Sequence, residues 1–282
     1  MTISGGHALP FGPFELEHRS LQSGVRTWVE QQTGLSLGYV EQLYTFADAD
    51  RAEHVGWHIS ISYLALALET CPVNTASHGW RSWYEFFPWE DHRFSVPQVI
   101  GDVIIPRLLC WSCVPSDSAI RDTRRRRIER LFGLNHHEWN EELVLQRYEL
   151  LYEAGAVAEA TRTHSNDRPC PVPSRPMVTD HRRILATAIA RLRAKIKYRP
   201  VVFELMPATF TLLHLQRTVE ALAGRVVHKQ NFRRLIEQQE LVEETGESTT
   251  ITGGRPAKLF RFRQAVLEER TVSGTRLPLS RA

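Results

Sequence analysis

Apolar residues recur at helical spacing near the C-terminal end of the chain. The first run lies between Thr211, whose hydroxyl is placed to cap a helix, and Gly224, which is placed to end it. The second run covers residues 228–239 and alternates between an apolar and a polar face. The pattern predicts two short helices joined by a turn, and the apolar face of the second comprises Phe232, Leu235 and Ile236.

Two strands are predicted directly after these helices. Residues 241–242 and 259–262 are rich in strand-forming side chains, and the segment between them is rich in Gly and Thr. Two helices and a hairpin are the outline of a winged helix-turn-helix, in which the second helix enters the major groove of DNA.

The polar face of the second predicted helix carries side chains that suit DNA. Asn231 and Gln230 can pair bidentately with adenine, and arginine can pair in this way with guanine. Because Arg233 and Arg234 are adjacent, we expect one to contact a base and the other the backbone. An ordinary solvated surface is the alternative for any one arginine. Phosphate or minor-groove contacts are predicted for Lys229, Arg255 and Lys258.

Regular patterns return near the N-terminus. An amphipathic helix is predicted to end at Gly34, and strands are predicted over residues 37–46 and 57–68, with a turn at 47–51. The second strand changes from alternating to fully apolar, as a buried strand does.

The middle of the chain has weaker signals. The aromatic cluster at residues 80–88 favours core or dimer packing over stacking on adenine. A single helix is predicted over residues 138–159, with a place at a dimer interface. Cys110 and Cys113 have C-x-x-C spacing without a second ligand pair, which disfavours a metal site. The arginine run at 124–127 favours a solvated helix face over phosphate contact.

A Pro-rich segment precedes the C-terminal elements. Residues 163–178 hold four of the 15 Pro and are interpreted as a linker. A helix is predicted from Asp180 to Tyr198, and residues 201–205 are predicted to form the first strand of the winged domain. The helix has an apolar face and a basic opposite face, which comprises Arg182, Arg183, Arg191, Arg193, Lys195 and Lys197.

Composition narrows the class of protein. The chain has 282 residues, 42% of them apolar, which suffices for about two domains. Without a long apolar run, a signal-peptide pattern or many Cys, we expect a cytoplasmic protein with no membrane span. Residues 181–282 hold 19 Lys+Arg and 9 Asp+Glu, against the remaining 16 and 23 in residues 1–180. This split suits a regulatory domain fused to a nucleic-acid-binding one.

The predicted N-terminal helix ends in Gln31-Gln32-Thr33-Gly34-Leu35. A Nudix box ends in Glu-Glu-x-Gly and an apolar residue, and its glutamates converge on Mg²⁺, which activates water against a pyrophosphate. Here Gln31 and Gln32 replace two of these glutamates. Thr27 and Trp28 stand in place of an Arg-Glu pair, and Arg19 stands in place of the upstream glutamate, which leaves only Glu30. An amide keeps the shape of a carboxylate without its charge, so we expect no catalytic residue, metal or cofactor.

Coupled to a C-terminal winged helix, this degenerate box resembles the Nudix-related transcriptional regulators of NAD metabolism, particularly the alphaproteobacterial branch called NAD regulator. The resemblance covers most of the chain, including the blocks LPFGPFELEHRSL, WVEQQTGLSLGYVEQLYTFAD, FFPWEDHR, QRYELLYEAG and HKQNFRRLIEQQELVEETG. It implies a degenerate Nudix-like α/β/α sandwich that senses ADP-ribose or a related NAD-derived nucleotide. It also implies a homodimer on a palindromic operator near genes of NAD biosynthesis or salvage.

Nudix folds normally have strands before the box helix, whereas few residues precede it here. Either the natural start lies upstream of Met1 or the sensor sheet lacks an edge strand, and we favour the first explanation, an N-terminally truncated sensor.

The effector pocket is predicted on the strand that follows the box helix. Arg51 can take a phosphate, and Tyr44 or Phe46 can stack on a base. Glu41 and Gln42 lie on the same strand and complete the predicted site.

These inferences together predict a ligand-responsive repressor of mixed α+β or α/β class. The sensor domain is assigned to residues 1–162, the linker to 163–179 and the winged helix-turn-helix domain to 180–282. One alternative is a Nudix pyrophosphohydrolase, acting for example on ADP-ribose, with an accessory winged helix. Another is a winged helix used for protein contacts only.

Overall fold

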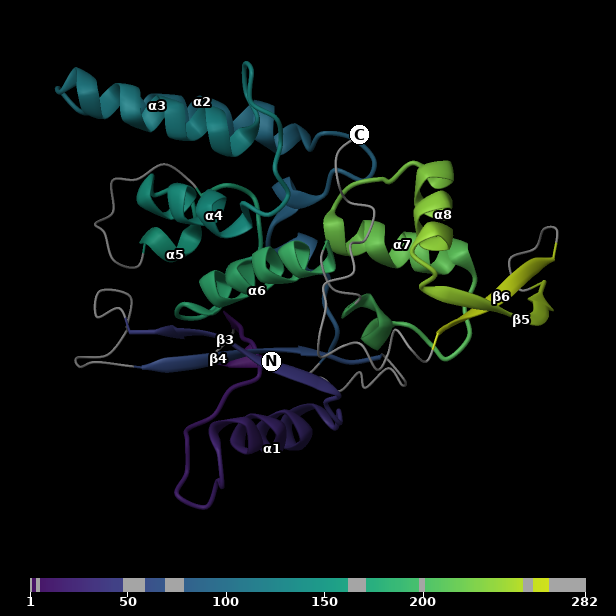
Figure 1. The fold of residues 1–282 in the computed structure, drawn as a ribbon. Coiled ribbons are helices and arrows are strands. Elements are labelled where there is room, and N and C mark those ends of the chain that lie inside the picture. Colours follow the sequence, from purple (N-terminus) through teal and green to yellow (C-terminus); the bar gives the residue numbers. More distant parts are fainter. Residues whose placement is uncertain are drawn as a thin grey trace.

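The computed structural model describes residues 2–3, 6–47, 59–68, 79–161, 171–197, 201–250 and 256–263. Helix α6 (His181–Ile196) lies in the middle of the molecule. It contacts the N-terminal sheet, helix α4 and the first helix of the C-terminal pair, so it joins the two parts that Figure 1 shows.

An antiparallel pair of strands lies between two helices in the N-terminal part. β3 (Tyr39–Phe46) pairs with β4 (Ser60–Leu66), as the two strand patterns predicted. α1 (Leu21–Thr33) covers one face of this sheet and α6 covers the other (Figure 1). The layers therefore run helix, sheet, helix. Two shorter strands pair separately, β1 (Thr2–Ile3) and β2 (Gly6–His7).

Both ends of α1 have local causes. The side chain of Ser20 accepts from the backbone N–H of Ser23, and Ser23 returns a hydrogen bond to the backbone of Ser20. Gly34 ends the helix with φ of 69°, a left-handed conformation that glycine adopts without a Cβ clash. The predicted end of this helix is confirmed.

A group of helices follows the sheet, and Figure 1 shows them on the opposite side of α6 from β3 and β4. The predicted single helix over residues 138–159 is wrong. Gly155 takes φ of 67° and breaks the helical path, so two helices occupy the segment. The elements of this group are η2 (Trp83–Glu85), η3 (Pro88–Glu90), η4 (Ile100–Ile104), α2 (Ile105–Cys113), α3 (Ser118–Phe132), α4 (Val144–Glu153) and α5 (Ala158–Thr161).

The aromatic segment before α2 supplies core side chains. Phe86, Phe87 and Trp89 are buried among the helices of this group. Phe87 meets Trp89 and Tyr148 edge-on, which is a preferred geometry for aromatic rings. Packing rather than adenine stacking therefore accounts for this part of the cluster.

Helix α6 contributes to two hydrophobic cores. Leu192 and Ile196 pack with leucines of the sheet and with the C-terminal helices. Ala186 and Ile189 pack instead with the aromatic segment and with α2, α3 and α4. The predicted basic face of α6 is wrong at two positions, because Arg182 and Arg193 are fully buried and paired with glutamates.

The C-terminal part has the predicted two helices and hairpin. Thr211 caps the first helix by accepting from the backbone N–H of His214, and Gly224 ends it with φ of 73°. The hairpin strands share an irregular register near Gly246. Its elements are α7 (Leu212–Ala223), α8 (Lys229–Gln238), β5 (Val242–Thr249) and β6 (Ala257–Phe262).

The strand predicted over residues 201–205 is wrong, because Val201–Leu205 forms the 3-10 helix η5. Val202 and Phe203 point into the core from this turn. The third strand of the wing is reduced to one bridge, in which Phe210 pairs with Phe260 of β6.

Within the described segments, no helix has the length and apolar character that crossing a membrane requires.

Candidate nucleic-acid interface

Helix α8 presents a polar face to solvent. Its buried side is formed by Phe232 and Ile236, as the apolar pattern predicted. Among the residues that the structure describes, the side chains of the opposite face have no hydrogen-bonding or ionic partner, so their donors are available to an external ligand. The exposed residues of this face are Lys229, Gln230, Asn231, Arg233 and Arg234.

Two polar side chains of α7 hold the turn that precedes α8. Gln216 donates to the backbone carbonyl of Val227 at 3.2 Å and to the carboxylate of Glu220 at 3.0 Å. Glu220 in turn accepts from the backbone N–H of Val227 at 3.0 Å. These bonds fix the start of α8, because Val227 directly precedes its N-cap residue His228. Neither side chain was predicted, and the available signal was a pair of polar residues four apart on an apolar helix.

Cations of the wing are paired with glutamates. Lys258 lies 2.8 Å from Glu244 across the hairpin, and Arg261 lies 2.6 Å from Glu243. Both pairs are exposed, and exposed pairs contribute little to stability, so a phosphate can compete for these cations. Arg255, the other predicted wing contact, lies outside the described residues.

The residues predicted to bind the effector lie in different environments. Glu41 forms an ion pair with Lys195 of α6 and accepts from the hydroxyl of Tyr39 at 2.6 Å. Burial, reinforced by this bond to Glu41, raises the pKa of Tyr39. Gln42 is exposed and lies beside the bulge of β3. The carboxylate of Glu41 is therefore already occupied, whereas the amide of Gln42 faces solvent.

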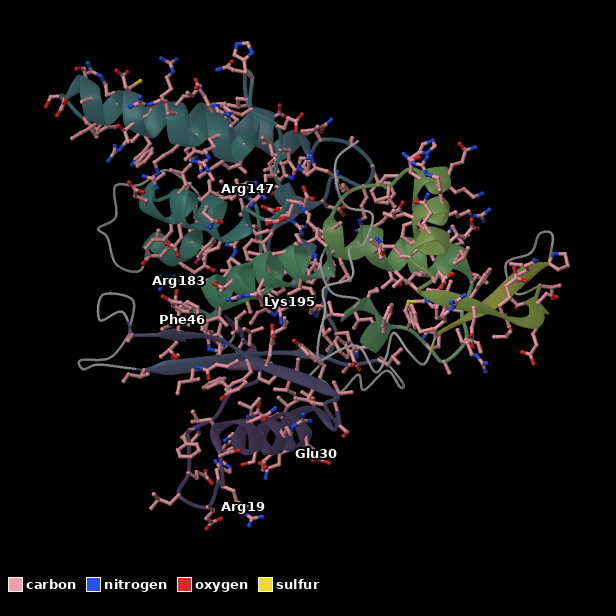
Figure 2. All side chains as sticks on the ribbon, viewed as in Figure 1. Arg19, Glu30, Phe46, Arg147, Arg183 and Lys195 are labelled. Carbon is pink, nitrogen blue, oxygen red and sulfur yellow. The ribbon has the colours of Figure 1, made fainter. Side chains whose placement is uncertain are left out.

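Two aromatic residues of the predicted pocket do lie together. Tyr44 is 56% exposed and meets Phe46, which is 5% exposed, with 5.0 Å between ring centroids. The guanidinium of Arg183 lies 5.1 Å from the Phe46 ring, and Figure 2 shows both between β3 and α6. Arg183 is a neighbour that the sequence pattern placed on the basic face of the helix, and it was not predicted to lie at this site. Arg51 lies outside the described residues.

In α1, which carries the degenerate Nudix box, the amide of Gln32 makes two hydrogen bonds that a carboxylate could not both make. Gln32 donates to the backbone carbonyl of Phe11 at 2.6 Å and accepts from the N–H of Phe11 at 3.2 Å. An ionised glutamate cannot donate, so it would lose one of these bonds. Gln31 and Glu30 are exposed. In the described part of the chain, no group of three or more His, Cys, Asp or Glu is placed to hold a metal ion.

Residues 202–262, which run from η5 to the end of β6, match the NrtR DNA-binding winged helix domain. This match covers the winged helix alone. The "ADPR responsive transcriptional repressor NtrR" of Acinetobacter baylyi is 43% identical over 83 residues, which are 29% of this chain and 33% of that protein. The match thus spans about a third of that relative's length.

Two solved structures share the fold over most of this chain. Shewanella oneidensis NrtR in complex with a 27mer DNA has 22% identity and a TM-score of 0.51, and NrtR from the same organism has 19% and 0.53. Each comparison covers 96% of this chain and 86% of the other. The predicted fold class, a Nudix-like part of mixed helices and strands followed by a winged helix, is confirmed. The predicted resemblance to Nudix-related regulators is confirmed as well.

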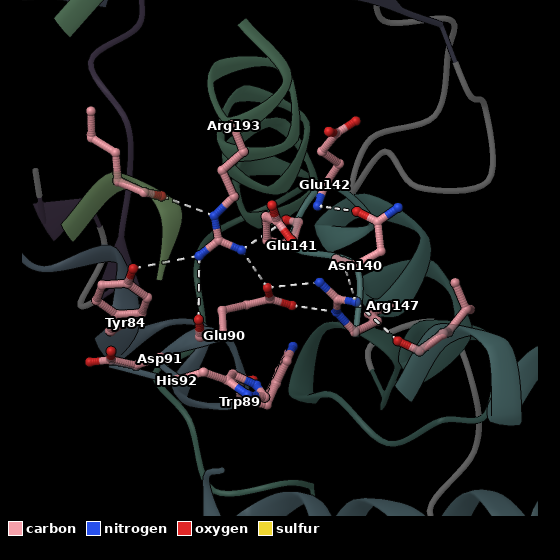
Figure 3. Close-up of polar contacts among 12 residues, drawn as sticks. Tyr84, Trp89, Glu90, Asp91, His92, Asn140, Glu141, Glu142, Arg147 and Arg193 are labelled. Atoms are coloured by element: carbon pink, nitrogen blue, oxygen red, sulfur yellow. Dashed lines mark hydrogen bonds and ion pairs between the residues drawn. The ribbon is translucent and has the colours of Figure 1, made fainter. Parts of the chain in front are cut away.

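A buried ion-pair centre lies outside the NrtR winged helix domain and was not predicted. The carboxylate of Glu90 lies 2.6 Å from Nε of Arg147 and 2.7 Å from Nη1 of Arg193, and Figure 3 shows both guanidinium groups turned toward it. Burial opposes ionisation of Glu90, but the two guanidinium groups outweigh it and lower the pKa of this carboxyl. The centre joins η3, α4 and α6.

Proposed function

We propose that this chain is a transcriptional repressor that binds a palindromic operator as a homodimer and responds to ADP-ribose or a related NAD-derived nucleotide. The observation that carries the proposal is the free polar face of α8 within an NrtR winged helix domain. The name of the Acinetobacter baylyi relative and the DNA bound to the Shewanella oneidensis NrtR agree with it. Genes of NAD biosynthesis or salvage are the proposed targets.

The side chains of α8 suit both kinds of DNA contact. Gln230 and Asn231 can each pair with adenine, and one of Arg233 and Arg234 can pair with guanine. Lys229 lies at the start of the helix, where the backbone N–H groups also favour an anion. On the wing, Arg255 and Lys258 are proposed to contact phosphates or the minor groove.

Substitution of the two arginines tests the interface. An operator can be selected from a random-sequence DNA pool and its affinity measured by fluorescence anisotropy with Arg233→Ala and Arg234→Ala. We expect alanine at the position that contacts a base to weaken the free energy of operator binding by about 1–3 kcal/mol. We expect alanine at the other position to lower the slope of log affinity against log salt concentration by about 1. Arg125→Ala on α3, an exposed arginine of another helix, is the matched control. Unchanged operator binding in both α8 variants would exclude this assignment.

The effector site is proposed around Tyr44 and Phe46, with Glu41, Gln42 and Arg51 as the other members. An exposed aromatic ring beside a buried one offers a stacking surface, and Arg183 adds a cation at the same place. Calorimetry with ADP-ribose tests it. Tyr44→Ala is expected to weaken binding, whereas Trp80→Ala, which removes a similarly exposed aromatic ring elsewhere, is expected to leave binding unchanged.

A non-catalytic sensor follows from the chemistry of the box helix. Gln31 and Gln32 carry no charge, and Gln32 is engaged with Phe11. We therefore propose that the domain binds its nucleotide without cleaving it. Release of AMP from ADP-ribose by the purified protein in the presence of Mg²⁺ would instead support the pyrophosphohydrolase alternative.

The assembly and the domain limits are part of the same proposal. A dimer on a palindrome places two copies of α8 in successive major grooves. Light scattering of the purified chain, alone and with a selected operator, tests the stoichiometry. One chain per duplex would exclude the homodimer. The proposed limits remain residues 1–162, 163–179 and 180–282.

A further inference from the structure

The last carbonyl groups of any α-helix lack partners within the helix and need donors from elsewhere. At the end of α7 these donors come from outside the NrtR winged helix domain. The acceptors lie in the last turn of α7 and at the glycine that ends it, just before the turn that leads into α8. The hydroxyl of Tyr84 donates to Ala221 O at 2.7 Å, Nε of Arg193 donates to Leu222 O at 3.0 Å, and the N–H of His92 donates to Gly224 O at 2.7 Å.

We propose that Tyr84, His92, Glu141 and Arg193, here called the turn clamp, are positioning residues that set the orientation of α8 relative to the sensor. This inference deepens the proposed function and rests on it for its meaning. All four residues precede the NrtR winged helix domain in the chain. None belongs to the face of α8 that would contact DNA.

Arg193 is the central member of the turn clamp. Its guanidinium connects the ion-pair centre to the winged helix. It binds the carboxylate of Glu90 at 2.7 Å and donates to the backbone carbonyl of Leu222. It also donates to the backbone carbonyl of Glu141 at 3.0 Å (Figure 3). A planar guanidinium with several fixed donors holds its partners in one relative geometry, which a lysine cannot do.

The carboxylate of Glu90 is in turn held by Arg147 of α4. Arg147 donates to it through two nitrogens, at 2.6 Å and 2.9 Å, and donates to the carbonyls of Leu131 and Asn140, both at 3.0 Å. Its guanidinium also lies 3.7 Å from the centroid of the Trp139 ring. The clamp is therefore anchored on the helices of the sensor side rather than on a flexible side chain.

Glu141, the fourth member of the clamp, forms ion pairs with two cations. This buried carboxylate lies 3.5 Å from Arg225 in the turn after α7 and 3.0 Å from Lys197 at the end of α6. Burial raises the pKa of Glu141, but its backbone hydrogen bond and these cations outweigh burial, and the net pKa is lowered. Gly224 and Arg225, at the start of the turn, are thus both bonded to residues outside the winged helix.

Close packing at Gly224 leaves no room for a side chain at this position. A Cβ at this position would come closer than 3.0 Å to the backbone carbonyl of Glu90 and to the guanidinium of Arg193, and 3.1 Å from the hydroxyl of Tyr84. Apolar contacts also join α6 to α7, through Leu192 and Ile196. Apolar contacts are not directional, whereas hydrogen bonds are. The hydrogen bonds of the clamp therefore determine the orientation of α8 relative to the sensor.

Movement on the sensor side would reach α8 through these bonds. The clamp joins η2, the segment after η3 and α6 to the end of α7. Gln216 and Glu220 bind Val227 at the other end of the following turn, directly before the N-cap of α8. A change in α6 caused by a ligand between β3 and α6 would therefore change the presentation of α8.

Distance measurements between spin labels test the inference without DNA. One label is placed on Cys110, an exposed free thiol of α2, and the other on Gln238→Cys at the exposed end of α8, with the remaining cysteines changed to serine. The parent is expected to give a single narrow distance distribution. Tyr84→Phe, Arg193→Lys and the double variant are expected to give a broadened or shifted one.

Two controls separate positioning from general destabilisation. Arg182→Lys disturbs an equally buried arginine of α6, which pairs with Glu159 at 3.1 Å and donates to Ser174 and Phe86, all of which precede the winged helix. Tyr63→Phe removes a hydroxyl from β4 without touching the clamp. Both are expected to keep the parent distribution. An unchanged distribution in the double variant would overturn the inference, and Tyr84→Phe keeps the test valid if Arg193→Lys does not fold.

Operator affinity is the second measurement. Clamp variants are expected to bind a selected operator about 2- to 30-fold more weakly, the range in which residues remote from a ligand alter coupling. If no DNA sequence is selected by the parent, the proposed function fails, and the distances still decide whether the clamp orients α8. Full operator affinity together with a broadened distribution would support the role of the clamp in orienting α8 and would show that this orientation does not serve DNA binding.

Discussion

Two arginines of α6 are fully buried in the interior of the molecule. Arg182 binds Glu159, the hydroxyl of Ser174 and the carbonyl of Phe86, whereas Arg193 binds Glu90 and carbonyl groups around it. A buried charge is costly unless it is paired and its donors are satisfied. Each buried guanidinium is therefore stable only while the acceptors around it are in place, and loss of one of them should destabilise the fold.

Removal of the charge of Glu90 should be strongly destabilising. Glu90→Gln leaves two buried guanidinium groups around a neutral amide, and breaking a buried pair in this way typically costs about 3–5 kcal/mol. We expect a loss of this size in the free energy of unfolding measured by urea titration. Glu153→Gln removes an exposed partner of Arg127 and should cost less than about 1 kcal/mol. Equal losses in the two variants would contradict the importance of the buried centre.

His181 gives stability a dependence on pH. Its Nδ1 accepts from the backbone N–H of Leu9 at 2.9 Å, and burial lowers its pKa from 6.5 to about 4. Because the unfolded chain binds the proton more readily, stability is complete above about pH 6.5 and is lost as the pH falls toward 4. The expected loss is up to about 3 kcal/mol.

Urea titrations across this pH range measure the effect. His181→Gln keeps an acceptor for Leu9 and cannot titrate, so the variant should lose this part of the pH dependence. If the free energy of unfolding depends on pH equally in both proteins, groups other than His181 cause the dependence.

At the scale of elements, the turn between α7 and α8 depends on a glycine for two reasons. Gly224 has φ of 73°, and a Cβ there would collide with the backbone of Glu90. Gly246 in β5 has φ of 83° but has open space around it. We expect Gly246→Ala to cost about 1–2 kcal/mol from backbone conformation alone. Gly224→Ala should cost clearly more, as measured by thermal or urea unfolding.

The elements that could be predicted are those with local signals. Thr211 and Gly224 mark the ends of α7, and Gly34 marks the end of α1, because a cap depends on neighbours in the chain. The apolar spacing of Phe232 and Ile236 in the same way identified the buried side of α8. The exposed residues of that helix follow from it, which is why the candidate DNA contacts could be located.

Long-range partners explain what could not be predicted. Helical periodicity placed Arg193 on a basic face opposite the apolar one. Its burial could not be predicted, because its partner Glu90 lies 103 positions away in the chain. Residues 201–205 have strand-forming side chains, yet they form η5, where Val202 and Phe203 reach the core. Intrinsic preference is weak and tertiary packing overrides it. The occupied carboxylate of Glu41 likewise depends on Lys195, which no local pattern indicates.

At the scale of the whole molecule, α6 makes the two parts interdependent. A fragment that begins at residue 180 would expose Ala186 and Ile189 and leave Arg182 and Arg193 without their glutamates. We expect this fragment to unfold at a lower temperature than the full chain, or to aggregate. Near-ultraviolet circular dichroism and size-exclusion chromatography measure this. A fragment as stable as the full chain would show that the winged helix domain is independent.

The shared helix also constrains the order of events during synthesis. Chains generally fold domain by domain from the N-terminus, at about 5–20 residues per second of translation. Here the helical core around Trp89 is completed by Ala186 and Ile189, so it cannot close until α6 has left the ribosome. The sheet must wait for Leu192 and Ile196 as well. Most of the nascent N-terminal part therefore emerges before it can bury its apolar residues, and these residues stay exposed until α6 has been synthesised.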